Sequence, residues 1–245
     1  MIIGGKMIKE LSVGLIIADD SEYAALLNIE GIDFKECNFN KHLGHKFSFK
    51  KGEKNISVWA VCCKTGMVNA AITAQHIIDT GAKVLVNYGL SGGLQNVARG
   101  EDVVGTAFFE HDFDLTCLGY GPCEKPGQEY IYYAQPSLVE LALKAASPAK
   151  SGKMASGDCF VSDTKLRDLL KDKFGAMCCD METAAIASAA YFSDIPFISL
   201  RRVSDGAGDE AADDYRQMND APQEAVAEKA LNIIKALFDE ESLWG

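Results

Sequence analysis

Residues 11–28 read Leu-Ser-Val-Gly-Leu-Ile-Ile-Ala-Asp-Asp-Ser-Glu-Tyr-Ala-Ala-Leu-Leu-Asn. The first eight residues form a mostly apolar run, which is typical of a buried strand. Asp19 and Asp20 end this run, and Ser21 is placed to cap a helix over residues 22–28. The stretch therefore predicts a strand that passes directly into a helix.

The same alternation continues through most of the chain. Apolar runs predict further strands at 58–63, 84–88, 103–109 and 195–200, and helical spacing predicts helices at 68–78, 138–146 and 181–192. Asp163 is expected to cap one more helix, and the last helix is expected to have Asp220 as its cap and Pro222 in its first turn. This alternation predicts an α/β fold with a largely parallel sheet. Because no repeat or linker interrupts it, we expect a single domain over residues 1–245.

The charge balance limits the possible partners. Lys and Arg number 24 against 35 Asp and Glu, which gives a formal net charge of −11. A nucleic acid or an anionic membrane would be repelled, and the longest basic cluster, residues 42–51, is interrupted by apolar residues. No run of about 18 apolar residues occurs. We therefore expect neither nucleic acid nor a membrane as a partner.

The eight cysteines do not form a disulfide pattern. Cys62-Cys63 and Cys178-Cys179 are adjacent pairs within apolar runs, the other four are scattered, and no Cys-x-x-Cys spacing occurs. They are expected to be reduced thiols that pack as small apolar side chains. The first ten residues lack the apolar core of a signal peptide. Both features predict a cytoplasmic protein.

Two motifs suggest chemistry that their surroundings do not support. Residues 89–93 read Gly-Leu-Ser-Gly-Gly, which matches a nucleophile elbow, but a helical stripe does not follow and His111 is the one histidine downstream. We expect instead a glycine turn that lets backbone N–H groups approach a small ligand. His42 and His45 lack further ligands at metal-binding spacing, so no metal site is expected.

Two other segments have a sequence pattern that predicts their structure but no specific role. Residues 111–135 are irregular and rich in Gly, Pro and aromatic residues, which predicts a long loop of the kind that is often functional. The acidic run 209–214 is expected to be a solvated loop or the start of a helix.

Three acidic residues follow predicted strands. Glu22 follows the strand at 11–18, Glu182 follows the apolar run 176–179, and Asp205 follows the strand at 195–200. The carboxyl ends of the strands form the ligand-binding edge of a parallel sheet. The three carboxylates are therefore candidates to meet in one cleft, although acidic residues at helix starts also complement the helix dipole.

Four segments together resemble the nucleoside phosphorylase/nucleosidase superfamily, most closely the 5′-methylthioadenosine/S-adenosylhomocysteine nucleosidases. They are residues 14–26, Asn87 to Leu94, Ser156 to Val161, and Asp180 to Asp205, which contains Met-Glu-x-x-Ala-x-Ala followed by Arg-x-x-Ser-Asp. The match extends over about residues 10–240 in the same order. The resemblance implies a three-layer αβα sandwich with a mixed, mostly parallel central sheet, and a homodimer.

The resemblance also implies roles for individual residues. Asp205 corresponds to the general acid beside purine N7, Glu22 to the carboxylate that activates the attacking water, and Arg201 to the residue that orients the acidic groups. The implied substrate-binding residues contact the sugar, the base or the 5′ group, and they are Met181, Glu182, Phe160, Val161, Ser204, Gly92 and Tyr215. In the family, the aromatic residue matched by Tyr215 often comes from the partner subunit.

This chemistry explains why an acid and a carboxylate are needed. Protonation of N7 turns a poor leaving group into a neutral base, and a carboxylate stabilises the positive charge that develops on the sugar. Water then attacks C1′. Hydrolysis of 5′-substituted adenosines by this route requires neither a cofactor nor a metal, and the one small-molecule partner is the nucleoside.

Two positions depart from the family pattern. Leu90 stands where a small hydroxyl residue is common, and Asp19 stands where the family usually has an apolar residue near the ribose. Both affect the substrate more than the reaction type. The alternatives are a phosphorylase of the same fold and a non-catalytic nucleoside-binding protein. A phosphorylase needs cations for phosphate, whereas the end of the first strand carries Asp19 and Asp20.

Overall fold

The computed structural model describes residues 2–3, 6–39, 41–219 and 223–244, with side chains described from residue 8 onward. One of its inner strands, β3 (Lys9–Ile17), contains the apolar run of residues 11–17. Leu11, Val13, Leu15 and Ile16 are all buried. Helix α1 (Asp20–Leu27) follows two residues later, so the predicted strand–helix unit is confirmed.

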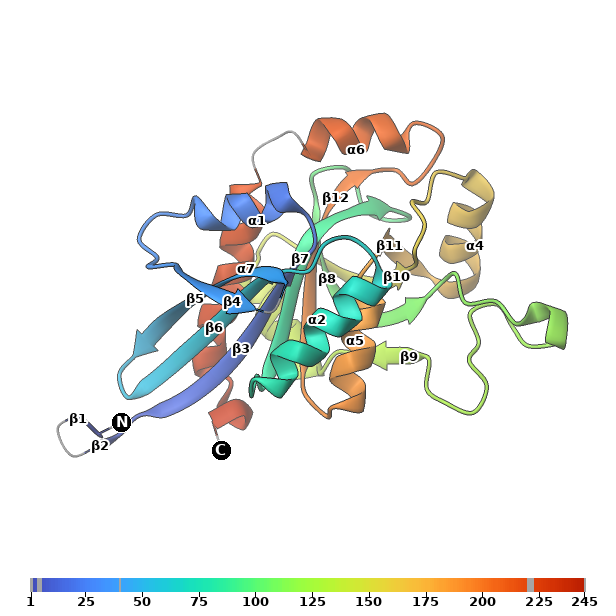
Figure 1. Ribbon diagram of the computed structural model, residues 1–245. Helices are drawn as coiled ribbons and strands as arrows, with labels where there is room; N and C mark the ends of the chain where they lie inside the picture. Colours follow the sequence, from blue (N-terminus) through green and yellow to red (C-terminus); the bar gives the residue numbers. More distant parts are fainter. Residues whose placement is uncertain (1, 4–5, 40, 220–222, 245) are drawn as a thin grey trace.

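One large mixed sheet forms the middle of the molecule (Figure 1). Its order is β11-β10-β8-β12-β7-β3-β6-β5-β4, and β9 pairs with β8. Strand β3 is parallel to both of its neighbours, and β12 is parallel to β7 but antiparallel to β8. The bounds of these strands are β4 Lys35–Phe39, β5 His42–Lys51, β6 Lys54–Cys62, β7 Val84–Gly93, β8 Asp102–Glu110, β9 Ile131–Tyr133, β10 Lys150–Ser156, β11 Ala176–Asp180 and β12 Phe197–Asp205.

Helices cover both faces of the sheet, which confirms the three-layer α/β architecture. On one face α2 (Met67–Asp79) and α5 (Thr183–Phe192) lie side by side. On the other face α7 (Glu224–Ala236) packs against β7 and is flanked by α1 and by α3 (Pro136–Ala145). Two further helices, α4 (Thr164–Phe174) and α6 (Ala211–Asn219), lie toward the carboxyl ends of the strands. A short two-strand pairing joins β1 (Ile2–Ile3) and β2 (Lys6–Met7).

Two local expectations were wrong. Residues 89–93 are not a turn, because β7 continues through Gly93 and pairs with β12 and β11. The N-cap of α1 is Asp19 rather than Ser21, since its Oδ1 accepts a hydrogen bond from Ser21 N at 2.7 Å. The interrupted basic cluster at 42–51, for which no element was predicted, forms strand β5.

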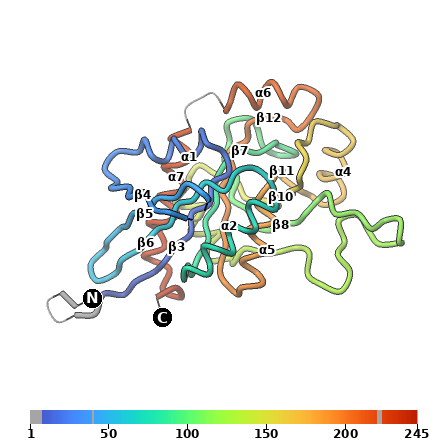
Figure 2. The backbone as a smooth tube through the Cα atoms, in the orientation of Figure 1, coloured from blue at the N-terminus to red at the C-terminus, as the bar shows by residue number. Residues whose placement is uncertain are grey.

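Other expectations have mixed outcomes. Asp163 caps α4 as predicted, and the acidic run at 209–214 leads into α6. The segment between β8 and β9 is a long irregular excursion from the sheet, as expected (Figure 2). The expected cap Asp220 and Pro222 lie outside the described residues. Among the described residues, no helix is long and apolar enough to cross a bilayer.

Candidate active site

A cavity of about 610 Å³, counted to include its open mouth, lies at the carboxyl ends of the central strands. All ten residues predicted as site residues line it, and they are Gly92, Glu22, Phe160, Val161, Met181, Glu182, Arg201, Ser204, Asp205 and Tyr215. They come from α1, β7, β12, α6 and the segments after β10 and β11. The expectation that Glu22, Glu182 and Asp205 meet in one cleft is therefore confirmed.

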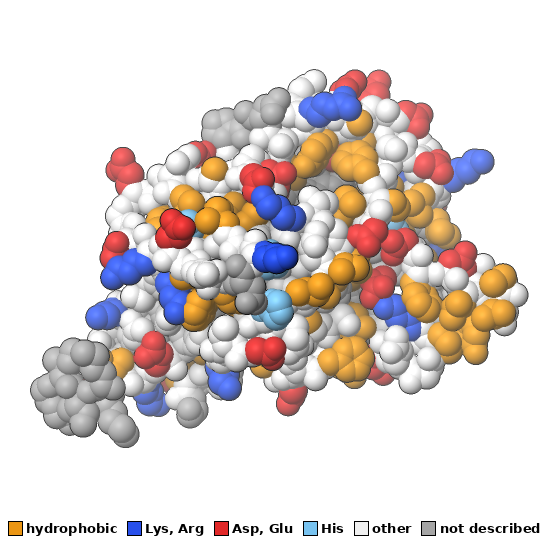
Figure 3. Space-filling model, in the orientation of Figure 1, with side chains coloured by type: hydrophobic (Ala, Val, Ile, Leu, Met, Phe, Trp, Pro, Cys, Tyr) orange, Lys and Arg blue, Asp and Glu red, His pale blue; other side chains and the backbone are white. Residues whose placement is uncertain are grey.

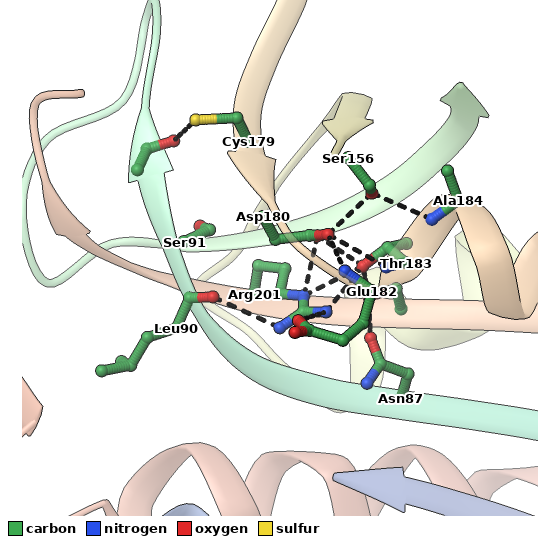
Figure 4. Close-up of polar contacts among 12 residues, drawn as sticks. Asn87, Leu90, Ser91, Ser156, Cys179, Asp180, Glu182, Thr183, Ala184 and Arg201 are labelled. Carbon is green, nitrogen blue, oxygen red and sulfur yellow. Dashed lines mark hydrogen bonds and ion pairs between the residues drawn. The ribbon is translucent and has the colours of Figure 1, made fainter. Parts of the chain in front are cut away.

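Arg201 lies at the floor of this cavity and is completely buried. Its Nε lies 3.1 Å from Asp180 Oδ2, and its Nη2 lies 3.5 Å from Glu182 Oε2 (Figure 4). The guanidinium also donates to Thr183 Oγ1 at 2.8 Å and to the carbonyl of Leu90 at 3.3 Å. A buried cation needs such partners because desolvation is costly. Arg201 therefore holds β7 and the segment after β11 together.

Asp180 is the main partner of Arg201. Its Oδ1 accepts hydrogen bonds from Ser156 Oγ at 2.7 Å and from the backbone N–H groups of Glu182 and Thr183 at 3.0 and 2.9 Å. Burial opposes its charge, but Arg201 and these hydrogen bonds outweigh burial and lower the pKa of Asp180 below its ordinary value. Asp180 thus stays ionised and fixes the backbone that carries Glu182.

Glu22 is buried against β7. Its Oε1 accepts a hydrogen bond from Leu90 N at 2.7 Å, whereas its Oε2 has no hydrogen-bond partner among the described residues. A Cβ on Gly89 would lie 2.9 Å from Glu22 and 2.5 Å from Arg201 Nη1, so only glycine lets both side chains approach this strand. Burial raises the pKa of Glu22 to about 8. One oxygen of Glu22 is therefore free to face a ligand.

Glu182 spans two parts of the site. Its Oε1 accepts a hydrogen bond from Gly66 N at 3.0 Å, and its Oε2 faces Arg201. Burial raises its pKa. The neighbouring Met67 N donates to Asp158 Oδ1 at 2.7 Å, so two carboxylates satisfy N–H groups at the start of α2. Glu182 is held rigidly beside the loop that precedes this helix.

Asp205 lies at the end of β12, beside Gly92. Ser204 Oγ is 2.6 Å from its Oδ2, and Ala207 N donates to its Oδ1 at 2.8 Å. A Cβ on Gly92 would lie 3.1 Å from both Asp205 Oδ1 and Cys179 Sγ, so this glycine leaves room for the carboxyl. Burial raises the pKa of Asp205, although the bonds from Ser204 and Ala207 oppose the rise. A raised pKa favours a carboxyl that carries a proton.

Two aromatic rings border the mouth of the cavity. Phe160 is 43% exposed, and its ring lies 5.6 Å from that of Tyr215 in an edge-on arrangement. Tyr215 lies on α6 and lines the cavity of its own chain. The same helix is bound by Arg99, whose Nη1 donates a hydrogen bond to Asp214 Oδ1 at 2.9 Å. Val161 beneath Phe160 is buried. The rings provide an apolar border suited to a planar ligand.

Comparison with known proteins places this cavity in a family. The model described as the phosphorylase superfamily matches residues 12–239. A 5′-methylthioadenosine/S-adenosylhomocysteine nucleosidase of Desulfotalea psychrophila is 30% identical over 237 residues, which cover 94% of this chain and 96% of that relative. The chain belongs to the phosphorylase superfamily and to its nucleosidase family.

Solved structures of relatives have the same fold. A nucleosidase variant of Helicobacter pylori with 5′-methylthioadenosine in its active site is 26% identical, with a TM-score of 0.81 and coverage of 94% of this chain and 99% of that chain. A futalosine hydrolase mutant from the same organism is 25% identical, with the same TM-score and coverage. This fold thus accommodates hydrolases named for different nucleosides.

Sequence reasoning assigned no role to several residues of this nucleosidase site. The sequence places Asp180 where a strand meets a helix at the ligand-binding edge, but it does not connect Asp180, Thr183 or Ser156 with Arg201. Thr65 and Cys179 also line the cavity. The available signal for Asp180 was its acidic side chain two positions before Glu182. Its contacts with Ser156 on β10 and Arg201 on β12 could not be predicted, because they form only when these strands come together in the fold.

Asp180→Asn is expected to lower the free energy of unfolding by about 3 kcal/mol, because it leaves Arg201 buried with one ionised partner fewer. The matched control is Asp168→Asn, which removes a partly exposed carboxylate paired with Arg167 at 3.1 Å. The control should leave stability nearly unchanged, because a solvent-exposed ion pair contributes little. Urea denaturation measures both, and equal stability of the two variants would contradict the account of Asp180.

Proposed function

We propose that this protein hydrolyses the N-glycosidic bond of 5′-substituted adenosines, such as 5′-methylthioadenosine and S-adenosylhomocysteine, to adenine and the thio-ribose. One domain spanning the chain carries the activity. The observation that supports this most strongly is the convergence of Glu22, Glu182 and Asp205 on one cavity. Relatives named as nucleosidases support the same reaction.

In the proposed mechanism Asp205 is the general acid. It donates a proton to N7 of the purine, so that adenine leaves as a neutral base. Burial and the raised pKa of Asp205 favour the protonated form that this step requires. Ser204 bonds to the same carboxyl and fixes its orientation. Phe160 and Val161 contact the base, Gly92 lets it approach β7, and Tyr215 closes over the sugar and the 5′ group.

Glu22 and Glu182 act on the sugar side. Glu182, with Met181, binds the ribose hydroxyls. The free Oε2 of Glu22 binds the attacking water and accepts its proton. Arg201 keeps these groups in place, and their negative charge stabilises the oxocarbenium-like sugar.

The charge of the cavity favours water over phosphate as the nucleophile. Five carboxyl side chains line it, from Asp19, Glu22, Asp180, Glu182 and Asp205, and Arg201 is the one Lys or Arg among the lining residues described. Asp180 and Glu182 already engage that arginine. A phosphate dianion would therefore meet net repulsion. Phosphorolysis remains the alternative reaction, and non-catalytic nucleoside binding is the other.

Adenine release tests the proposal directly. We expect the protein to release adenine from 5′-methylthioadenosine equally well with and without inorganic phosphate.

Asp205→Asn should abolish turnover while the affinity for the nucleoside changes by less than about tenfold, because the change removes a proton donor but keeps the shape of the side chain. Strict dependence on phosphate would establish phosphorolysis, and a fully active Asp205→Asn would refute the acid assignment.

The pH profile tests the pairing of Asp205 with Glu22. The reaction needs one proton shared between the two carboxyls, on Asp205 and not on Glu22. Because burial raises the pKa of Glu22 to about 8, kcat/KM should fall as the pH rises through this value and the last proton leaves the pair. It should fall again in acid, when both carboxyls are protonated. In Glu22→Gln only Asp205 has to be protonated, so the residual activity should no longer fall in acid and should still decrease as Asp205 loses its proton. An unchanged profile in this variant would contradict the pairing.

We also infer that the protein is cytoplasmic and forms a homodimer. All eight cysteines are free thiols, which fits a reducing compartment. Large apolar side chains are exposed on the face formed by α2 and α5, where Val68 is 66%, Ile72 47% and Phe192 65% exposed. Figure 3 views the molecule from this side, with orange side chains over α2. Exposed apolar surface of this kind marks interfaces, and a second copy of the chain is the proposed occupant.

Replacing an apolar residue on this face should separate the subunits. Ile72→Glu places a charge in the middle of the exposed side of α2, so it should convert the dimer to a monomer in sedimentation equilibrium. Leu169→Glu, at an exposed apolar position on α4, should leave the dimer intact. A monomeric unmodified protein, or equal effects of the two variants, would contradict this assignment.

A further inference from the structure

The cavity has two chemically different ends. At one end Asp205 and Gly92 are in register on β12 and β7, and Cys179 Sγ lies 3.7 Å from the carbonyl of Gly92. The other end is formed by Asp19 and Thr65, which follow the ends of β3 and β6 and also line the cavity. These two strands are parallel neighbours on the far side of β7 from β12. The ends therefore lie on opposite sides of β7.

Asp19 is a fixed carboxylate at the second end. Its Oδ1 accepts hydrogen bonds from Ser21 N at 2.7 Å and from Ser21 Oγ at 2.6 Å, which hold the side chain in place as the N-cap of α1. Its charge contributes to the raised pKa values of both Glu22 and Tyr215, so it lies close to two other residues of the cavity. The carboxylate is thus positioned before any ligand arrives.

No described cation pairs with Asp19 directly. Lys64, the nearest in sequence, donates to the exposed carboxylate of Asp20. Arg201 is engaged by Asp180 and Glu182. Thr65 also lines the cavity at this end. A ligand group placed beside Asp19 would therefore meet a carboxylate that no described cation neutralises.

The proposed function determines which part of the substrate lies there. With the base beside Asp205 and the sugar hydroxyls on Glu182, the 5′ substituent leaves the ring at C4′, on the other side of the ring oxygen from the base-bearing C1′, and can extend away from the base. Glu182 accepts a hydrogen bond from Gly66, the residue after Thr65, so the sugar site borders the Asp19 end. The 5′ substituent is then directed toward Asp19 and Thr65.

We propose that Asp19 selects nucleosides whose 5′ substituent carries a protonated amine, in preference to those with a neutral thioether. This inference rests on the proposed function and extends it to the substrate class. The ammonium donates a charge-assisted hydrogen bond to Asp19, whereas a thioether offers no donor and leaves the carboxylate desolvated. A 5′-phosphate is repelled at the same position.

The test compares two substrates in three proteins. The substrates are 5′-amino-5′-deoxyadenosine and 5′-methylthioadenosine, and kcat/KM for adenine release is measured in the unmodified protein, Asp19→Asn and Asp20→Asn. Asparagine caps helices about as well as aspartate, so Asp19→Asn removes the charge and keeps the cap. Asp20→Asn removes the neighbouring charge, which pairs with Lys64 outside the cavity lining.

Asp19→Asn should lower kcat/KM for the amine by about 10- to 100-fold, as expected for the loss of a charge-assisted hydrogen bond, and for the thioether by less than about threefold. Asp20→Asn should leave the ratio of the two values unchanged. An unchanged ratio in Asp19→Asn, or an equal shift in Asp20→Asn, overturns this inference while adenine release upholds the proposed function. If neither substrate releases adenine, both are overturned.

Discussion

The arrangement of the cavity depends on the burial of one guanidinium. Arg201 is completely buried and is surrounded by Asp180, Glu182, Thr183 and the carbonyl of Leu90. Without that cation, neighbouring buried carboxylates would repel one another and would protonate. With it, Asp180 stays ionised, whereas Glu22, which accepts a backbone N–H of β7, keeps a raised pKa. One buried ion pair thus allows carboxyl groups with different protonation states to share a single cavity.

Strand β7 brings the two sides of this arrangement together. Gly89 lets Glu22 and Arg201 approach the strand, and Gly92 leaves space for Asp205 and Cys179. A side chain at either position would overlap the atoms it faces by several tenths of an ångström. The glycines of residues 89–93 therefore serve close packing within a continuous strand, so the Gly-x-Ser-x-Gly spacing reflects packing here and the nucleophile-elbow interpretation does not apply.

The sequence was sufficient for the α/β class and for the ten predicted residues that line the cavity. Apolar runs identify central strands such as β3 because both faces of these strands are buried, and acids placed directly after such runs must meet at one edge of the sheet. Predictions from neighbouring residues failed where contacts between residues distant in sequence determine the local structure. Residues 89–93 look like a turn but gain partners on β12 and β11, and Asp180 acquires its meaning from Ser156 and Arg201, which are distant in sequence. The family resemblance supplied roles that spacing alone left open.

The central claim is that the carboxyl groups organised by Arg201 surround the glycosidic bond of one bound nucleoside. A crystal structure with a non-hydrolysable 5′-substituted adenosine analogue tests it most directly. The account predicts the purine between Phe160 and Asp205, the sugar hydroxyls on Glu182, and Glu22 facing C1′. An analogue bound outside this cavity, or bound with its base at the Asp19 end and its sugar remote from Glu182, would contradict it.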